Sequence, residues 1–414
     1  MSSNRSKEIH LANRPTGFPD DTNFIVKEVD LTDPNTDEVL VKNLWMSVDP
    51  YMRGRMIDRK SYVPPFQIDQ VLEGGAIGIV EKSNSSNLNE GDYVMSNYGW
   101  REYFVTNENN LKVINPEFGP IQAYLGALGM PGLTAYAGLL EVGKLQDGEN
   151  VLVSAAAGAV GSVVCQIAKA KGCKVYGTSG SDEKCRWLEK ELGIDKAINY
   201  KKVDNLISEY RSQITDGIDV YFENVGGDHL EAAINILNVG GRIALCGMID
   251  QYNDEAVRSG PPNLMMLIMK NASIQSIKDH NPVWFGCDVG KYFSRNLGVM
   301  DDKLFDFELF YGTGFNLTKK QRLEYGESQM THAMLFTGVD LDNNEKPVKW
   351  RVENSWGTKG GEKGYNIMSD KWFDEYNYEV VVHKNHLPDE LVDLFNNEDA
   401  IHLDPWDPMG ALAR

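Results

Sequence analysis

The sequence predicts a combined α/β and α+β protein made of three consecutive segments. Residues 1–128 hold short strand-like runs broken by Gly, Pro, Asn and Asp, which is typical of a small antiparallel barrel or sandwich. From Gly129 strand-like and helix-like runs alternate, which indicates a doubly wound parallel sheet. From residue 277 the runs "AMLFTGVDLD", "VKWRVENSWG" and "YEVVVHK" predict long antiparallel strands. We therefore expect domains at residues 1–128, 129–276 and 277–414.

Length and composition limit the classes of function. A chain of 414 residues can form two or three domains with an ample core. Its formal net charge of -19 argues against a nucleic-acid partner, because the phosphates would be repelled. The start "MSSNRSKEIHLANRP" has no apolar run typical of a secretory signal. The apolar stretch 150–168 contains Ser and Gln, so we interpret it as a buried strand and helix and expect no membrane partner.

The cysteine pattern points to a reducing compartment. No two cysteines form a C-x-x-C pair, which argues against a disulfide framework and a structural zinc site. We therefore expect a cytoplasmic protein. The five cysteines are Cys165, Cys173, Cys185, Cys246 and Cys287.

The middle segment carries a dinucleotide-binding fingerprint. After the expected strand 150–154 comes Ala156-x-Gly158-x-x-Gly161, which leads into an expected helix at 162–171. Gly158 would let the backbone approach a pyrophosphate, Gly161 would let helix and strand pack closely, and the helix N-terminus would attract the phosphate charge. A packing turn of small residues is the alternative, but the surrounding strands and helices favour nucleotide binding.

The second strand of this segment predicts the type of cofactor. Enzymes that use NAD place a carboxylate at the end of this strand to bind the ribose hydroxyls. Here residues 178–181 read Thr-Ser-Gly-Ser, and Lys184 follows shortly after. Small hydroxyls and a lysine suit a 2′-phosphate, so we predict NADPH. The alternative is that Lys184 is an ordinary solvated helix residue.

Residues 1–276 resemble the zinc-free medium-chain NADP-dependent reductases, specifically the prostaglandin reductase and 2-alkenal reductase group. The matching words are "LVKNLWMSVDPYMRGRM" (40–56), "ALGMPGLTAYAG" (127–138), "AAAGAVGSVV" (155–164), "FENVGG" (222–227) and "RIALCGMIDQYN" (242–253). The resemblance implies a GroES-like substrate domain followed by a Rossmann domain that binds NADP.

The resemblance also implies a set of cofactor-binding residues. The pyrophosphate would lie on one turn, the 2′-phosphate on a Lys–Tyr pair, and the adenosine and nicotinamide side on an asparagine and a second turn. These groups are Gly158, Ala159, Val160 and Gly161; Lys184 and Tyr200; and Asn224 with Cys246, Gly247, Met248, Ile249, Asp250, Gln251 and Tyr252.

The first segment lacks the ligands that zinc-dependent relatives need. No cysteine precedes Cys165, and His10 is the one histidine among the first 150 residues, so we expect no metal site and no metal-assisted alcohol oxidation. Hydride transfer to the activated C=C bond of an enal or enone remains, and it leaves an enolate that needs hydrogen-bond donors. By resemblance these donors would be Tyr51 and Tyr252. The alternative for Tyr51 is an aromatic in the barrel core.

The last segment resembles the C-terminal part of bleomycin hydrolase and aminopeptidase C, which are papain-like cysteine peptidases. The matching words are "PVWFGCDVGKYF", "MTHAMLFTGV", "KWRVENSWGTKGGEKGYNIMSDKWFDEYNYEVVV" and "PWDPMGALAR". The resemblance implies that His332 is the general base, that Asn354 orients its ring, and that Trp356 shields their hydrogen bond. The arm 410–414 would reach toward the cleft. Without this resemblance, His332 would be read as a structural residue.

The nucleophile of such a peptidase is missing. The first four cysteines belong to the dinucleotide-binding segment, and Cys287 lies in the apolar strand "WFGCDVG", where we expect a buried, inert thiol. The glutamine that would supply the oxyanion hole is missing too. We therefore expect no cysteine peptidase activity.

The reductase resemblance stops short of a complete domain. We expect "ASIQSI" (272–277) to begin a sixth strand, after which the closing helix and the return strand to the first domain are missing. Our leading interpretation is an NADPH-dependent reductase of enals or enones, a small-molecule substrate. The alternatives are a cysteine aminopeptidase and a chimera with neither activity. A homo-oligomer is possible on either resemblance, although the assembly elements are incomplete.

Overall fold

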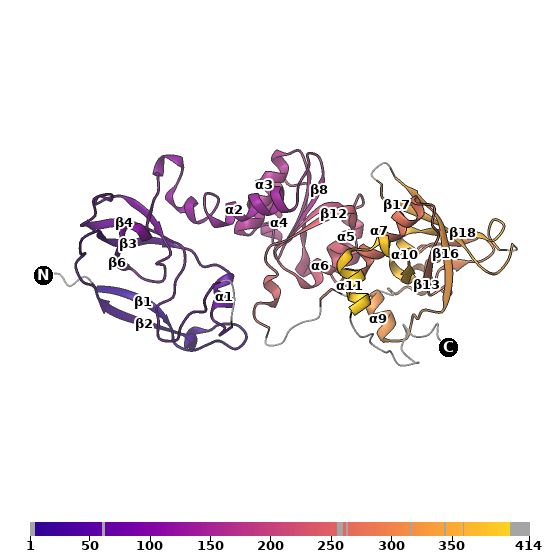
Figure 1. The fold of residues 1–414 in the computed structure, drawn as a ribbon, viewed down its shortest axis with the longest axis horizontal. Coiled ribbons are helices and arrows are strands. Elements are labelled where there is room, and N and C mark those ends of the chain that lie inside the picture. The colour runs from indigo at the N-terminus through magenta and orange to yellow at the C-terminus, as the bar shows by residue number, and fades with distance from the viewer. Residues whose placement is uncertain are drawn as a thin grey trace. The chain divides into compact units, whose positions relative to one another are not determined.

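The computed structural model describes residues 5–59, 63–254, 260–261, 264–314, 317–342, 345–358 and 360–397 (Figure 1). The chain divides into two compact units. The first contains residues 1–203, 218–230 and 242–259, and the second contains 204–217, 231–241 and 260–414. No helix of the described residues is long and apolar enough to cross a membrane.

The N-terminal strands form antiparallel sheets, as the sequence predicts. β1 (Arg5–Leu11) pairs with β2 (Phe24–Asp30), and a five-stranded sheet has the order β6-β3-β4-β5-β7. Its strands are β3 (Glu38–Met46), β4 (Ala76–Ser83), β5 (Tyr93–Ser96), β6 (Tyr103–Asn107) and β7 (Lys112–Val113). Val39, Val41, Val80, Val94 and Phe104 pack beneath this sheet. The short helix α1 (Tyr51–Arg55) follows β3.

The dinucleotide-binding segment forms a sheet with the order β10-β9-β8-β11-β12. β8 pairs in parallel with β9 and β11, and β9 with β10, which confirms the doubly wound prediction. The strands are β8 (Asn150–Val153), β9 (Lys174–Ser179), β10 (Lys196–Asn199), β11 (Ile218–Glu223) and β12 (Leu237–Leu245). The helices are α2 (Met130–Tyr136), α3 (Ala159–Ala170), α4 (Asp182–Lys190), α5 (Leu206–Gln213) and α6 (Gly227–Ile234).

The parallel strands are buried on both faces, which explains their continuous apolar sequences. Val151, Val153, Val175, Val220 and Phe222 are all inaccessible to solvent and belong to one core cluster. Helix α3 contributes its apolar face to the same cluster through Val164, Cys165 and Ala168.

The C-terminal segment forms a seven-stranded sheet with the order β14-β15-β18-β17-β16-β13-β19. Its strand pairs are antiparallel except β15 with β18. The strands are β13 (Val283–Cys287), β14 (Phe293–Ser294), β15 (Val299–Met300), β16 (His332–Leu341), β17 (Pro347–Glu353), β18 (Tyr365–Ser369) and β19 (Asn377–Val381). The helices are α7 (Leu264–Lys278), α8 (Phe307–Tyr311), α9 (Lys319–Glu324), α10 (Asp370–Tyr376) and α11 (Asp389–Asn397). Phe285, Phe336, Trp350, Trp372 and Phe373 fill its core.

The expected sixth strand at 272–277 is wrong, because these residues lie in α7. Met269, Ala272, Ser273, Ile274 and Ser276 are buried while residues 271, 275 and 278 are exposed. Buried positions at i, i+3, i+4 and i+7 are the pattern of a helix face and not of a strand. A short apolar run does not distinguish the two structures by itself, and here the packing of α7 in the C-terminal core decides.

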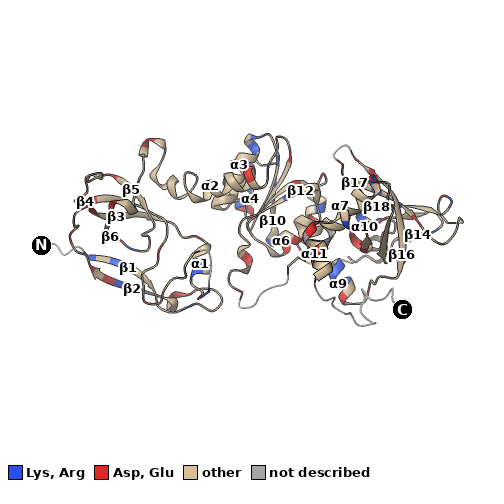
Figure 2. Ribbon diagram, in the orientation of Figure 1, with Lys and Arg blue, Asp and Glu red and all other residues tan. Residues whose placement is uncertain are grey.

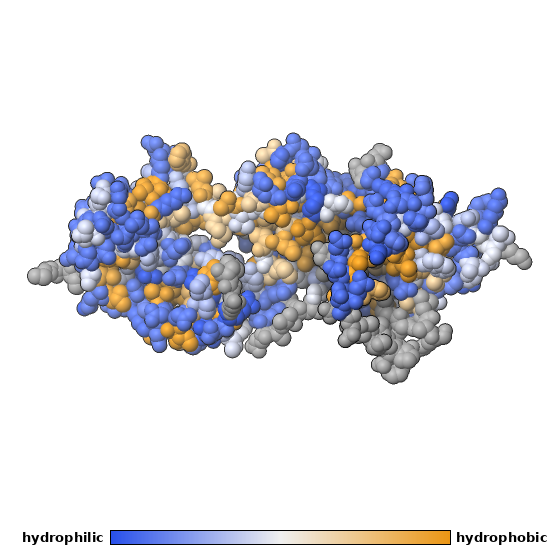
Figure 3. Space-filling view, in the orientation of Figure 1, coloured by the Kyte–Doolittle hydropathy of each residue, from blue (hydrophilic) through white to orange (hydrophobic). Residues whose placement is uncertain are grey.

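Polar and apolar surfaces are mixed over the molecule. Figure 2 shows acidic and basic residues interspersed on strands and helices of all three segments. A group of large apolar side chains is exposed around α2, where Figure 3 shows hydrophobic surface. This group is Phe118, Leu128, Leu133, Tyr136 and Val142, each at least half exposed. Contiguous exposed apolar surface of this kind is uncommon on a soluble monomer.

Candidate functional site

The carboxyl ends of the parallel strands place the predicted cofactor residues at one edge of the sheet. β8 ends at Val153 and leads through a tight turn to α3, whose N-cap residue is Gly158. A Cβ atom on Gly161 would lie 2.4 Å from the carbonyl oxygen of Ala155, so only glycine fits there. The fingerprint turn therefore has the close backbone packing that the sequence predicts, with the helix N-terminus beside it.

Asn224, at the end of β11, is held against the end of β8. Its side-chain Nδ2 donates to the carbonyl oxygen of Ser154 at 2.7 Å, and its backbone N–H donates to the Ser154 hydroxyl at 2.8 Å. These bonds fix the asparagine beside the fingerprint turn, as a cofactor-binding role requires.

Glu223 is a site residue that the sequence reasoning missed. Its side chain is inaccessible to solvent, and Oε1 accepts hydrogen bonds from the Ser154 hydroxyl (3.2 Å), the backbone N–H of Gly226 (2.7 Å) and that of Val225. The carboxylate thus organises the turn after β11. An acidic residue directly before "NVGG" was the available signal.

The second predicted turn, residues 246–252, is joined to Asn224 through the backbone. Cys246 and Gly247 donate to the carbonyl oxygen of Glu223 at 2.9 and 3.1 Å, and Ile249 donates to that of Asn224 at 3.2 Å. The Tyr252 hydroxyl donates to the Gly247 carbonyl at 3.0 Å. The structure therefore brings Asn224 and this turn together, as the resemblance implies.

Lys184 and Tyr200 lie at the ends of the neighbouring strands β9 and β10. Ser181 caps α4 by accepting from the backbone N–H of Lys184 (3.3 Å), which leaves the exposed lysine in the first helical turn. Tyr200 follows β10, and its hydroxyl lies 3.1 Å from the position of a Cβ atom on Gly180. The tyrosine therefore reaches the loop that begins α4.

The first acidic side chain after β9 is already engaged. Asp182 accepts from Asn199 Nδ2 at 2.6 Å and from Lys202 Nζ at 2.5 Å. The bond from Lys202 is the main reason that the pKa of Asp182 is lowered. An Asp182 carboxylate held by these partners is not arranged as the ribose-binding acid of an NAD enzyme.

His229 is a second residue that sequence reasoning missed. It is buried, its ring meets the Tyr200 ring edge-on with centroids 4.8 Å apart, and Nδ1 lies 3.5 Å from the Thr178 hydroxyl. Burial lowers its pKa to about 4, so the imidazole is neutral at physiological pH. A neutral ring packs against Tyr200 without placing a charge beneath it.

Tyr51 begins helix α1 and does not lie on a barrel strand. Its ring packs against the core cluster that includes Leu11 and Phe66, so it has the core contacts of the alternative interpretation. Arg53, on the same helix, donates from Nε to Asn253 Oδ1 at 2.9 Å. This bond joins the helix of Tyr51 to the residue that follows Tyr252.

The peptidase-like residues meet in the C-terminal sheet. His332 Nε2 and Asn354 Oδ1 are 3.0 Å apart, and the Trp356 ring lies over the imidazole with centroids 4.8 Å apart. The guanidinium of Arg295 lies over the Trp356 ring, 4.5 Å from its centroid. The structure therefore brings the three predicted residues into contact, and their catalytic roles stay predictions. The arm 410–414 lies outside the described residues.

Cys287 lies on β13 directly opposite His332 in the register of β13 with β16. Its side chain is inaccessible to solvent, and burial raises the pKa of its thiol. A buried neutral thiol is a poor nucleophile, which agrees with the inert role expected for it.

Metal ligands do not gather in the described part of the chain, where no group of three or more His, Cys, Asp or Glu side chains could hold an ion. His10 is already engaged, because Nε2 contacts Glu8 Oε2 at 3.0 Å and Nδ1 contacts the Asp69 carbonyl at 2.9 Å.

Comparisons with known proteins agree with this geometry. Family models match residues 7–114 as the N-terminal domain of an oxidoreductase and 159–278 as a zinc-binding dehydrogenase. The 2-alkenal reductase (NADP(+)-dependent) of Nicotiana tabacum is 42% identical over 277 residues, which cover 65% of this chain and 80% of that protein. This chain belongs to the medium-chain dehydrogenase/reductase family.

The chain is similar to other medium-chain reductases as well. Prostaglandin reductase 1 of Rattus norvegicus is 46% identical over 59% of this chain and 72% of its own length. The NADPH-dependent curcumin reductase of Escherichia coli is 39% identical over 64% and 76%. The crystal structure of CurA from Vibrio vulnificus in complex with NADPH superposes with a TM-score of 0.59 at 41% identity, over 63% of this chain and 77% of that one.

A third family model, the Peptidase C1-like family, matches residues 255–410. The medium-chain and peptidase matches overlap at 255–278, so helix α7 falls within both. The chain is thus a chimera of a medium-chain reductase and a peptidase-like segment, as the sequence predicts.

Proposed function

We propose that this medium-chain reductase uses NADPH to reduce the activated C=C bond of a small enal or enone. The observation that carries the proposal is the assembled cofactor edge, where the fingerprint turn, Asn224 and the turn 246–252 are bonded to one another. The matched relatives named as NADPH-dependent curcumin, 2-alkenal and prostaglandin reductases support this class of substrate.

The residues of the cofactor edge fit NADPH. Gly158, Ala159, Val160 and Gly161 would hold the pyrophosphate at the N-terminus of α3. Lys184 and Tyr200 would hold the 2′-phosphate. NADPH supplies the hydride when bound. Asn224 and the turn 246–252 would hold the adenosine and nicotinamide side of the cofactor.

The chain must also stabilise the enolate that hydride addition leaves on the substrate. We assign this task to the hydroxyls of Tyr51 and Tyr252, and the Tyr252 hydroxyl must first turn away from the Gly247 carbonyl to which it donates in this structure. A donor aimed at developing negative charge typically contributes ~3–4 kcal/mol to the transition state.

A kinetic comparison tests this assignment. Tyr51→Phe and Tyr252→Phe should each lower kcat with an enone about 10²-fold. NADPH binding should change little in Tyr51→Phe, whereas Tyr252→Phe also removes the bond to the Gly247 carbonyl in the cofactor turn. Tyr124→Phe serves as the control, because its hydroxyl bonds the Asn115 carbonyl at an exposed site. Unchanged kcat in both tyrosine variants would remove these residues from the reaction, and an absence of NADPH oxidation with any enone would contradict the proposed function itself.

Further proposals concern the setting of the enzyme. The five cysteines are all free, which supports a cytoplasmic location. The boundaries 128/129 and 276/277 remain our proposed limits of the substrate, cofactor and peptidase-like domains. We also retain homo-oligomerisation, for which the exposed apolar side chains around α2 are a candidate surface.

A further inference from the structure

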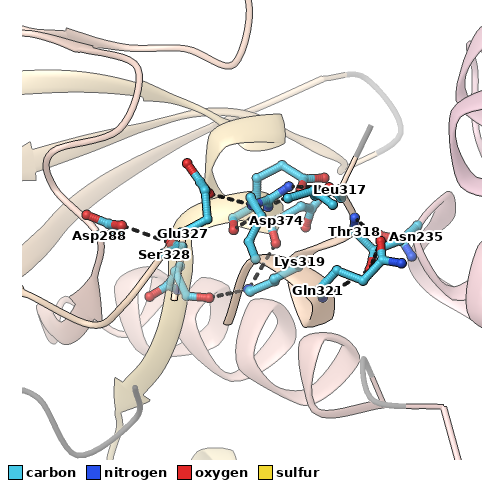
Figure 4. A network of polar contacts seen from close by, with 12 residues as sticks. Asn235, Asp288, Leu317, Thr318, Lys319, Gln321, Glu327, Ser328 and Asp374 are labelled. Atoms are coloured by element: carbon cyan, nitrogen blue, oxygen red, sulfur yellow. Dashed lines mark hydrogen bonds and ion pairs between the residues drawn. The ribbon is translucent and has the colours of Figure 1, made fainter. Parts of the chain in front are cut away.

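A buried cluster of charges lies within the second compact unit (Figure 4). Its centre is Glu375 on α10. Oε1 of Glu375 contacts Nη1 of Arg211 at 2.6 Å, and Oε2 contacts Nη2 of Arg322 at 2.5 Å. Arg322 belongs to the peptidase-like segment. Arg211 lies on α5 of the dinucleotide-binding segment, 164 residues before Glu375 in the sequence.

The contacts around this pair include further segments of the chain. Nη2 of Arg211 donates to Asn235 Oδ1 at 3.3 Å and lies 4.0 Å from Asp374 Oδ2. Lys270, on α7, contacts both Asp370 and Asp374 at 2.7 Å. The acidic residues of α10 therefore form ion pairs with cations from α5, α7 and α9. Asn235, just after α6, accepts a hydrogen bond from Arg211.

The three charged side chains at the centre of the cluster are largely buried. The side chains of Arg211, Glu375 and Arg322 are 20%, 18% and 12% exposed. Burial alone would raise the pKa of Glu375, but the two guanidiniums outweigh it and lower the pKa to about 2. Each member therefore depends on its partners, because a buried charge without a partner is strongly destabilising.

An apolar contact supports the same association independently. Val239, on β12 of the dinucleotide-binding sheet, packs against the core cluster of the C-terminal segment, which contains Trp350 and Phe373. Residues 204–217 and 231–241 accordingly belong to the same compact unit as residues 260–414.

We propose that the acidic edge of α10 is a docking surface for helix α5, so that the peptidase-like segment folds cooperatively with the dinucleotide-binding segment as part of its structure. The partner of this surface is α5 of the same chain, which contributes Arg211. This inference does not depend on which substrate the reductase uses.

The association has a direct consequence for unfolding. If α5 is fixed on α10, the dinucleotide-binding sheet and the C-terminal sheet lose their structure in one transition. If the contact between α5 and α10 contributes little free energy, the two sheets unfold at different denaturant concentrations.

Hydrogen exchange of the full chain across a urea series tests the proposal. Peptides from β8–α3 and from β16–β17 report on the two sheets. We expect one common midpoint for both groups of peptides in the natural sequence. Two separate midpoints in the natural sequence would overturn the proposal whatever the variants do.

Variants then test whether the ion pair carries the coupling. Arg211→Met should separate the two midpoints, and it should raise the unfolded population of the C-terminal sheet at least ~100-fold, since it leaves Glu375 without one of its two guanidiniums. Arg5→Met is the matched control, because its partners Glu28 and Asp30 form an exposed pair that contributes little.

A conservative variant covers the case in which Arg211→Met does not fold. Arg211→Lys keeps the charge, so it should fold and retain the common midpoint with a smaller loss. A common midpoint and an unchanged unfolded population in both Arg211 variants would overturn the role of this ion pair.

Discussion

Lys184 is the residue on which the choice between NADPH and NADH depends most directly. It lies exposed in the first turn of α4, and the first acidic residue after β9, Asp182, is engaged by Asn199 and Lys202. A charge-assisted contact to a phosphate contributes about 1.5–3 kcal/mol. Lys184→Ala should therefore weaken NADPH binding about 10- to 100-fold and NADH binding little, measured by titration of each cofactor.

The matched control for this variant is Lys190→Ala, at the far end of the same helix. It should leave both dissociation constants unchanged. Equal weakening of NADPH and NADH by Lys184→Ala would contradict the 2′-phosphate role and would favour the alternative of a solvated helix residue.

Cysteine peptidase activity should be missing although His332 and Asn354 are bonded. An imidazole alone does not form the acyl-enzyme, and loss of the nucleophile from such a unit removes about 10⁶-fold of the rate. Cys287 is buried with a raised pKa. A fluorogenic aminopeptidase substrate should show no turnover. Turnover that iodoacetamide and Cys287→Ser both abolish would prove that Cys287 is a nucleophile after all.

Among single residues, the sequence identified those that belong to a motif. Asn224 and the turn 246–252 are brought together because "FENVGG" and "RIALCGMIDQYN" lie at the ends of neighbouring strands. Glu223 and His229 were missed because their roles come from contacts with Ser154 and Tyr200, which are distant in sequence. A buried polar residue shows its function only through its partners.

Among the elements, those with a strong local pattern were predicted well. The strand expected at 150–154 is β8, and the helix expected at 162–171 is α3, which begins three residues earlier at Ala159. Helix α7 was misread as a strand, because its short apolar run fits both periods and tertiary packing decides between them. The contact between α5 and α10 is long-range and has no local sequence signal.

Helix α10 should make stability depend on acid through Glu375. Its pKa in the folded chain, about 2, lies below the ordinary value of 4.5. The stabilisation is therefore complete above about pH 4.5 and is lost as the pH falls through this range toward 2. The difference corresponds to about 3 kcal/mol. The free energy of unfolding should fall by this order between pH 5 and pH 2 through this group.

Glu375→Gln isolates that contribution. The variant should be less stable at neutral pH by about 3–5 kcal/mol, because Arg211 and Arg322 lose their buried partner, and the gap should close as the pH falls. Urea unfolding at a series of pH values measures both curves. A gap that stays constant down to pH 2 would mean that Glu375 is not the titrating group.

For the whole molecule, the sequence predicted two enzyme remnants in one chain, and the family models confirm both. The missing closing helix and return strand also predict a weak junction, because part of the reductase's apolar surface would stay uncovered. The exposed side chains around α2 agree with missing cover in the first unit. The junction itself differs from the weak connection expected, because α7 is a continuous helix whose buried face packs in the C-terminal core.

The backbone after α7 is closed by hydrogen bonds. Asp279 and His280 donate to the carbonyl oxygens of Gln275 and Ile277 at 3.0 Å each, and Asn281 donates to that of Ser276 at 2.9 Å. The side chain of Ser276 also bonds the Asn281 carbonyl at 3.1 Å. A protease must bind its substrate in an extended form, so these bonds would have to break before cleavage.

Limited trypsin digestion decides between the two expectations. From the sequence alone, the first cut falls between Ser276 and Pro282, and Lys278 supplies the trypsin site there. From the structure, that site should resist, because local opening would have to break the bonds of residues 279–281 and release α7 from its core. Cutting should then begin elsewhere, while Arg211→Met should expose Lys278 sooner. A first cut at Lys278 in the natural sequence would show that the two remnants remain separately folded.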